Sequence, residues 1–232
     1  DYTVNLWDIS NPAFPVKLKT LEEFTGPVES VIFSADGKTL ATSSDYELIL
    51  WDVADPSTPK LISKTDGYYT NLGFTLDGKI LTSLKIHSDV NNVVVLFDVS
   101  NPKSHVELTQ LESGDEELDI TRIIFNPNKN LLFFSRSDGS ILAWDVQNPE
   151  VPVMLSTMNG YGNWVYGLAL SPDENTLAVG DGGTIIALWD VTDPAAPSFL
   201  SSWSGHSFAI NSLAFSTDGN TLASSSTETN AQ

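Results

Sequence analysis

One phrase, repeated at a nearly constant interval, limits what this chain can fold into more than any other feature. In its clearest copy an apolar run ends in Trp51-Asp52, and prolines follow at positions 56 and 59. The aromatic position recurs with separations of 44, 46, 47 and 45 residues, at Trp7, Trp51, Phe97, Trp144 and Trp189. Repeats of this length are typical of proteins built from many copies of one small structural unit. We therefore predict a repeat architecture.

Each repeat contains the signals of four short β-strands. In the first complete repeat, residues 28–34 alternate apolar and polar side chains, and Asp36-Gly37 then predicts a tight hairpin turn. Residues 39–44 and 48–53 follow as the second and third strands, and residues 60–64 as the fourth. Proline at the start of the fourth strand confines it to a sheet edge, because proline cannot donate a ladder hydrogen bond. No apolar pattern with a helical period occurs.

These repeats, with their apolar run, Trp-Asp pair and turn signals, resemble those of the WD40 family. The tail Asn/Asp-Pro-x-x-Pro is similar to that of bacterial WD40-like and LVIVD-type repeat proteins, although His105 replaces the second proline in one copy. The resemblance covers essentially the whole chain and implies an all-β fold, a β-propeller of four-stranded antiparallel blades. It implies one domain, 1–232, with blades at approximately 28–65, 69–111, 120–158, 165–203, and 210–232 together with 1–21.

The chain supplies five blades' worth of sequence, whereas family propellers usually have seven. Residues 210–232 provide the first two strands of a repeat and residues 1–21 provide the last two. We predict that these terminal strands pair in one shared blade and close a five-bladed ring. A stretch cut from a longer tandem array would have matching ends too, so an open fragment of a larger propeller is the alternative. The chain starts within a repeat and without Met, which favours an excerpt or a processed piece.

The composition excludes several classes of function. The chain carries 30 acidic and 11 basic residues, a net charge of −19, and therefore lacks the basic footprint that nucleic acids or anionic membranes require. It has no cysteine, so disulfides and thiolate metal sites are excluded. No apolar run is long enough to span a membrane. Few lysines with many Ser, Thr and Asn favour a secreted or cell-surface protein, with a cytoplasmic one as the alternative.

Catalytic and metal-binding motifs are absent from the sequence. His87, His105 and His206 lie in different repeats, and none has a partner at metal-ligand spacing. Nucleophile-elbow, P-loop and dinucleotide-binding patterns are missing as well. One acidic run lacks the spacing of a calcium-binding loop and is interpreted as a solvated surface: Glu112, Asp115, Glu116, Glu117 and Asp119. We therefore predict a protein that is not an enzyme and uses neither cofactor nor metal.

The resemblance also implies a structural tetrad that links Asp, His, Ser or Thr, and Trp within a blade. The family's Gly-His pair occurs once, at Gly205-His206. Only the predicted shared blade therefore has a complete set, formed by His206, Ser224 or Ser225, Asp1 and Trp7. We expect the other blades to be held mainly by apolar packing between sheets.

In this architecture the connections between blades, and those between second and third strands, emerge at one end, here named the loop end. Aromatic residues gather in these connections, with acidic residues around them, as in many protein interfaces. The candidate binding residues are Phe24, Tyr46, Tyr68, Tyr69, Tyr161, Trp164 and Phe208.

We predict a scaffold that binds a protein or peptide at the loop end, and a basic partner segment suits the net charge. The alternatives are a propeller that recognises a small ligand or glycan, and the sensor domain of a larger bacterial protein. The sequence leaves the oligomeric state open, with a monomer favoured.

Overall fold

A computed structural model describes residues 2–101, 105–159 and 163–226. Two compact units divide the chain, Asp1–Leu111 (unit 1) and Glu112–Gln232 (unit 2), and each is described by itself. Every regular element among the described residues is a β-strand. The predicted all-β class is therefore confirmed.

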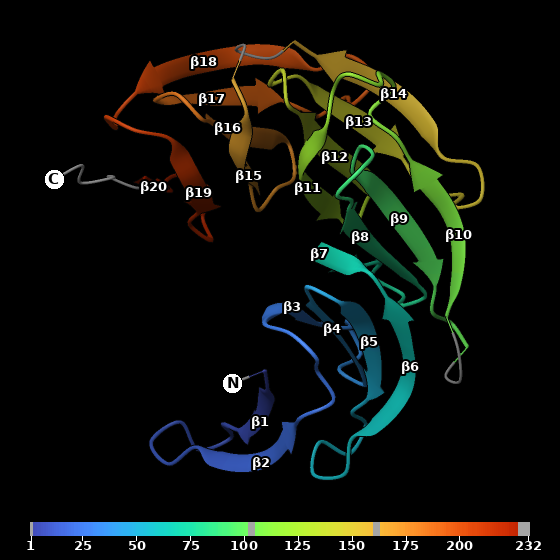
Figure 1. The fold of residues 1–232 in the computed structure, drawn as a ribbon. Coiled ribbons are helices and arrows are strands. Elements are labelled where there is room, and N and C mark those ends of the chain that lie inside the picture. The colour runs from blue at the N-terminus through green and yellow to red at the C-terminus, as the bar shows by residue number, and fades with distance from the viewer. Residues whose placement is uncertain (1, 102–104, 160–162, 227–232) are drawn as a thin grey trace, which may run out of the picture. The chain divides into compact units, whose positions relative to one another are not determined.

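Unit 1 contains two four-stranded antiparallel sheets and one two-stranded sheet (Figure 1). Strand order follows chain order in each, and the last strand of each four-stranded sheet lies at an edge, as the prolines predict. The strands are β1 (Val4–Asp8) and β2 (Val16–Leu21); β3 (Val28–Phe33), β4 (Thr39–Ser44), β5 (Glu47–Asp52) and β6 (Lys60–Asp66); and β7 (Tyr68–Phe74), β8 (Ile80–Ile86), β9 (Val93–Asp98) and β10 (Val106–Leu111).

Unit 2 repeats this plan with the two-stranded sheet at its end. Figure 1 shows the two four-stranded sheets, β11–β14 and β15–β18, before the last strand pair. The strands are β11 (Ile120–Asn126), β12 (Leu131–Arg136), β13 (Ile141–Asp145) and β14 (Val153–Met158); β15 (Val165–Leu170), β16 (Thr176–Asp181), β17 (Ile185–Asp190) and β18 (Ser198–Ser204); and β19 (Ile210–Phe215) and β20 (Leu222–Ser226).

The aromatic residue of the repeated phrase occupies the same register in all four complete sheets. A leucine on the second strand faces it in each, in the pairs Leu40–Trp51, Leu81–Phe97, Leu132–Trp144 and Leu177–Trp189. Because a slip of one residue would turn a strand's buried face to solvent, this constant register keeps the same positions in the core of every sheet.

Local side-chain hydrogen bonds explain the turns. In the first hairpin of unit 1, the Ser34 hydroxyl donates to Asp36 at 2.7 Å, and the backbone N–H of Lys38 donates to the same carboxylate at 3.0 Å. Gly37 has a φ of 70°, which favours glycine. The same Ser or Thr to Asp bond recurs at Thr75–Asp77, Ser171–Asp173 and Ser216–Asp218.

The repeated tail consists of two further turns of this kind. Asp52 accepts the backbone N–H of Ala54 at 3.1 Å, and Asp55 accepts that of Ser57 at 3.0 Å. Such bonds stabilise a turn without any tertiary contact. The Trp-Asp and Asp-Pro pairs therefore act as local signals that end the third strand and lead into the fourth.

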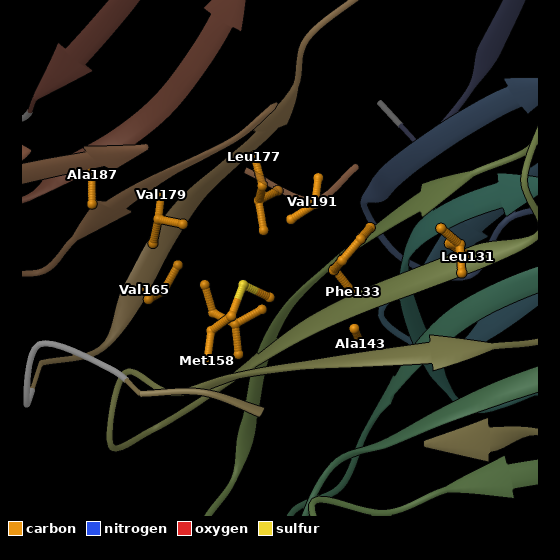
Figure 2. Close-up of a cluster of buried hydrophobic side chains, with 10 residues drawn as sticks. Leu131, Phe133, Ala143, Met158, Val165, Leu177, Val179, Ala187 and Val191 are labelled. Carbon is orange, nitrogen blue, oxygen red and sulfur yellow. The ribbon is translucent and has the colours of Figure 1, made fainter. Parts of the chain in front are cut away.

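Apolar packing of one sheet on the next forms the core. In unit 2 a cluster of buried side chains joins strands β12–β14 to β15–β17 (Figure 2). Phe133 and Ala143 contribute from one sheet, and Leu177, Val179 and Ala187 from the other. Unit 1 has the equivalent cluster between its two four-stranded sheets. Because neither sheet can bury this surface alone, each stabilises its neighbour.

The indole groups of the repeat differ in their hydrogen bonding. Trp51 Nε1 donates to Thr42 Oγ1 at 3.0 Å, and both residues are buried. Among the described residues, the indole nitrogens of Trp144 and Trp189 are buried without a partner. The register explains this difference, because Phe134 and Val179 occupy the place of Thr42 in these two sheets.

The half repeats at the chain ends form two-stranded sheets, β1–β2 and β19–β20, within the part of the chain that the structure describes. Trp7 on β1 is 52% exposed, whereas its counterpart Trp51 is buried. In unit 2, Leu200 on β18 is exposed, whereas its counterpart Leu155 packs against the core. These are apolar surfaces that a completed fifth blade would cover. The pairing of residues 210–232 with residues 1–21 stays a prediction.

Replacing Thr42 by Val should lower the free energy of unfolding by about 1–3 kcal/mol, because the indole N–H of Trp51 would be buried without an acceptor. The reverse change in unit 2, Val179→Thr, should stabilise the protein because it offers Trp189 the missing hydroxyl. Denaturant unfolding of both variants measures the two effects. Equal stability of Thr42→Val and the unsubstituted protein would contradict this account, and Val179→Ala controls for the loss of methyl groups.

Terminal pairing can be tested with an engineered crosslink, because the chain has no cysteine. In the register of the complete sheets Thr42 faces Ile49, and the corresponding residues of the shared blade are Ser224 and Asn5. The double variant Asn5→Cys, Ser224→Cys should form an intramolecular disulfide on mild oxidation, seen by non-reducing electrophoresis. The control Asn5→Cys, Ser212→Cys places the second thiol one strand further away. A crosslink only between two copies would contradict closure within one chain.

Candidate functional site

The structure divides the predicted binding residues into exposed and buried sets. Tyr46 is 59% exposed, Trp164 49% and Phe208 41%, whereas Tyr68 is half-buried. Tyr161 lies outside the described residues. Since Tyr46 and Tyr68 belong to unit 1 and Trp164 and Phe208 to unit 2, the structure yields a candidate surface on each unit.

The structure contradicts the predicted role of Phe24 and Tyr69 as binding residues. Both side chains lie in the core of unit 1, with exposed fractions of 7% and 1%. The ring centroid of Phe24 lies 6.1 Å from that of Trp51, and Tyr69 meets Phe97 edge-on at 5.8 Å. Burial, together with the nearby carboxylates of Glu107 and Asp66, raises the pKa of Tyr69 to about 12. Neither ring is available to a partner, so both are removed from the candidate surface.

Tyr46 forms an exposed aromatic platform between β4 and β5. Its ring lies directly against the backbone of Gly26, where an added Cβ would approach the ring carbon Cδ2 to 2.6 Å. Only glycine fits this close contact without displacing the ring. One face of Tyr46 is therefore supported by the segment that connects β2 to β3, while more than half of the side chain stays exposed.

Glu47 fastens that connecting segment to the sheet. Its buried carboxylate accepts the backbone N–H of Thr25 at 2.7 Å and the Thr25 hydroxyl at 2.5 Å. Lys64 on β6 adds an ion pair at 3.7 Å and also donates to the Glu23 carbonyl at 3.2 Å. Burial opposes ionisation of Glu47, but the bonds from Thr25 and the charge of Lys64 outweigh it and lower the pKa of the carboxyl. The base of the Tyr46 platform is thus held in place at neutral pH.

In unit 2, Trp164 is an exposed aromatic residue in the segment just before β15. Its carbonyl accepts the N–H of Gly182 at 2.5 Å, and its ring lies 6.3 Å from that of Tyr166. Buried Asp181 accepts the N–H groups of Gly183 and Ile185 at 3.1 and 2.8 Å. The stretch after Asp181 is therefore a strand-connecting turn packed beside Trp164.

Trp203 at the end of β18 and Phe208 after it lie at the same end of that sheet, because Ser204 pairs with Ile185 at the end where β15 begins. Both side chains are about two-fifths exposed, at 42% and 41%. His206 lies between them in sequence, and its Nε2 shares a hydrogen bond with Ser224 Oγ at 2.7 Å.

This bond is one link of the predicted tetrad. Asp1 lies outside the described residues, and Trp7 belongs to the other unit. The complete tetrad therefore stays a prediction.

Acidic residues greatly outnumber basic residues in unit 2. Residues 112–232 contain 15 acidic residues, two Arg and one Lys. Each cation is engaged within the unit: Arg122 donates to the Tyr166 carbonyl at 3.0 Å, Lys129 to the Glu174 carbonyl at 3.1 Å, and Arg136 to Ser140 at 2.6 Å. These three cations keep their charge but are far outnumbered by the acidic residues, so unit 2 attracts cationic groups.

The described residues contain no group of three or more His, Asp or Glu side chains able to hold a metal ion. They also include no helix of the length and apolarity needed to cross a bilayer. His105 is bound between Ser63, at 2.6 Å from Nδ1, and Thr65, and burial lowers the pKa of its imidazole. It therefore joins β6 to the segment before β10, a contact that its position in place of a proline does not predict.

Comparisons with known proteins place these features in a class of protein. Three segments, residues 15–52, 153–190 and 197–230, match the family model described as WD domain, G-beta repeat. These three segments are therefore similar to WD40 repeats, and the four-stranded antiparallel sheets are consistent with the blades of a WD40 propeller.

Among individual proteins, the chain is similar to the protein transport protein SEC31 of Dictyostelium discoideum, at 24% identity over 156 residues, which is 64% of this chain and 11% of SEC31. Among solved structures, Sqt1 of Saccharomyces cerevisiae superposes with a TM-score of 0.78 at 16% identity, covering 97% of this chain and 64% of that one. A chain of the Mitotic Checkpoint Complex gives 0.66 at 20% identity, covering 86% and 56%. The chain thus spans only part of each of these proteins, and the structural likeness shows the fold alone.

The bonds of the Glu47 carboxylate with Thr25 and Lys64 predict that the stability of the protein decreases in acid. Glu47→Gln keeps the shape but removes the charge, so the free energy of unfolding at pH 7 should fall by about 1.5–3 kcal/mol. The folded-state pKa of Glu47 is lowered, so its contribution is present above the unfolded value of about 4.3 and is lost as the pH falls through the folded value. Denaturant unfolding at neutral and acidic pH should therefore show the two proteins converging in acid.

The exposed variant Glu22→Gln changes the net charge by the same amount and controls for long-range effects. A stability difference between Glu47→Gln and the unsubstituted protein that persists at low pH would contradict a role for the charge.

Proposed function

We propose that this chain is a non-enzymatic scaffold that binds a protein or peptide through the loop end. The observation that carries the proposal is the pair of exposed aromatic groups on fixed supports, Tyr46 on Gly26 and Trp164 beside the Asp181 turn. Exposed aromatic side chains supply large contact areas, and Tyr and Trp are enriched among residues that dominate binding energy. Supports that are already ordered lower the entropy lost on binding.

The charge distribution favours a basic partner segment. The chain carries a net charge of −19, and the cations of unit 2 are engaged in internal hydrogen bonds. Complementary charge accelerates encounter and disfavours acidic competitors. A Lys or Arg side chain would also be attracted to the faces of the exposed rings.

The similar proteins agree with an interaction role at a coarse level. SEC31 is named as a protein of protein transport, and the Mitotic Checkpoint Complex is an assembly of proteins. The bacterial type of the repeats, a secreted or cell-surface location and a monomeric state are proposals at the same level, based on the sequence features given above.

Selection from a peptide display library that spans acidic, neutral and basic sequences would test the proposal. We expect basic peptides with affinities that fall as the salt concentration rises, because salt screens exposed charges. Tyr46→Ala or Trp164→Ala should weaken binding about tenfold or more, the effect of a dominant interface residue. Titration calorimetry of the selected peptides measures both effects.

Phe14→Ala is the matched control, because Phe14 is an exposed aromatic residue in the turn between β1 and β2, away from the loop end. Binding that survives Tyr46→Ala and Trp164→Ala together but is lost in Phe14→Ala would overturn the choice of surface. Enrichment of acidic peptides would overturn the assignment of charge.

A further inference from the structure

Unit 1 contains a cavity at the end of its sheets opposite to the loop end, here named the turn cavity. Its volume is about 280 Å³, and it lies between the β3–β4 turn, the β7–β8 turn and the segment after β9. It is lined by Ser34, Asp36, Thr39, Leu50, Ile62, Asp77, Gly78, Lys79, Val99, Ser100 and Asn101. A water molecule occupies about 30 Å³ of liquid, so the space suits a group of several heavy atoms.

Unit 2 shows how a side chain can join the equivalent pair of turns. There Lys129, in the β11–β12 turn, reaches across to the β15–β16 turn. Its ammonium group donates to the Glu174 carbonyl at 3.1 Å and to Asn175 Oδ1 at 3.2 Å. Asn128 adds a hydrogen bond to the Glu174 carboxylate. A lysine side chain thus bridges the two turns in unit 2.

In unit 1 the lysine of this bridge is replaced by glycine, and so is the residue whose backbone carbonyl accepts its ammonium group. By register, Gly37 occupies the place of Lys129, and Gly78 the place of Glu174. A Cβ at Gly37 would meet nothing within 4 Å, and one at Gly78 would meet only the Ser34 side chain, at 3.6 Å. Neither residue therefore has a side chain that could bridge the two turns, between which the turn cavity lies.

The lining offers both halves of a lysine binding site. Leu50, Ile62 and Val99 supply apolar surface for an aliphatic stem, and the carboxylates of Asp36 and Asp77 can accept an ammonium group. In each carboxylate Oδ1 is bound within its own turn, to the N–H of Lys38 or Lys79. These bonds, with those from Ser34 and Thr75, lower the pKa of both carboxyl groups, which are therefore ionised at neutral pH.

Lys38 and Lys79 lie near the outer oxygens, at 3.8 and 3.5 Å, but all four side chains are more than half exposed. Exposed ion pairs of this kind contribute little free energy, so a competing ammonium group can displace them.

We propose that the turn cavity binds the side chain of a lysine in a partner peptide, which takes the place that Lys129 holds in unit 2. The stem lies on Leu50, Ile62 and Val99, and the ammonium group lies between the Asp36 and Asp77 carboxylates. This site is independent of the loop end, because the two lie at opposite ends of β4. A partner could therefore be bound here even if the aromatic surfaces bind nothing.

Chemical-shift titration of the backbone amides of Gly37 and Gly78 tests the site directly. The probe is N-acetyl-lysine methylamide, and N-acetyl-norleucine methylamide, which has the stem without the charge, is the matched control. We expect saturable shifts with the lysine probe and a dissociation constant on the order of 1 mM, typical of a single side chain. Absence of shifts at about ten times that concentration, or equal binding of the norleucine probe, would overturn the proposal.

Amino-acid substitutions test whether the carboxylates bind the ammonium group of the probe. Asp36→Asn can keep the turn bonds through its oxygen and should weaken the lysine probe about tenfold, because one charge-assisted contact is lost. Lys79→Gln should tighten binding, because a competing cation is removed. Asp173→Asn, at the equivalent turn of unit 2, should change nothing. Equal affinity of the lysine probe for Asp36→Asn, Lys79→Gln and the unsubstituted protein would show that the carboxylates do not hold the ammonium group and would overturn the proposal.

Discussion

Packing of one twisted sheet against the next is the constraint on which the rest of this structure depends. Each four-stranded sheet has two largely apolar faces, and the buried clusters join neighbouring sheets within a unit instead of closing within one sheet. A single sheet would expose these faces to water, so the units can be stable only as arrays. The constant register between second and third strands supplies each sheet with the same apolar positions.

Because apolar packing carries the stability, polar contacts within and between sheets are free to differ from one repeat to the next. The buried indole has a hydroxyl acceptor in one sheet, Thr42, and an aromatic or aliphatic neighbour in two others. The bridge from Lys129 to the neighbouring turn exists in unit 2, whereas glycines stand in its place in unit 1. The hydrogen bond from Thr25 to the Glu47 carboxylate likewise belongs to one connection, the segment between β2 and β3. Such differences are where a repeated scaffold acquires individual sites.

The strands were predictable because their signals are local. The Asp-Gly turns and the Trp-Asp tail are fixed by side-chain to backbone bonds spanning two or three residues, such as those of Asp36 and Asp52. Burial of the loop-end aromatic residues was not predictable in this way. Phe24 lies in a connection and Tyr69 at the start of β7, close to the same end as Tyr46, but their rings turn inward onto Trp51 and Phe97. That choice depends on space left by a neighbouring sheet, which periodicity does not encode.

In the candidate sites too, the features set by local sequence could be predicted, whereas those set by tertiary contacts could not. The sequence already shows an excess of acid, but not that the few cations of unit 2 are held by carbonyl and hydroxyl groups. From the sequence, a glycine in a hairpin turn indicates only that the backbone needs a positive φ angle. Gly37 and Gly78 meet that requirement with φ values of 70° and 69°. Their second consequence, the lack of a side chain that could bridge the two turns beside the turn cavity, becomes visible only by comparison with Lys129 of unit 2. Comparing repeats within one chain thus separates what the fold requires of a position from what that position leaves available to a partner.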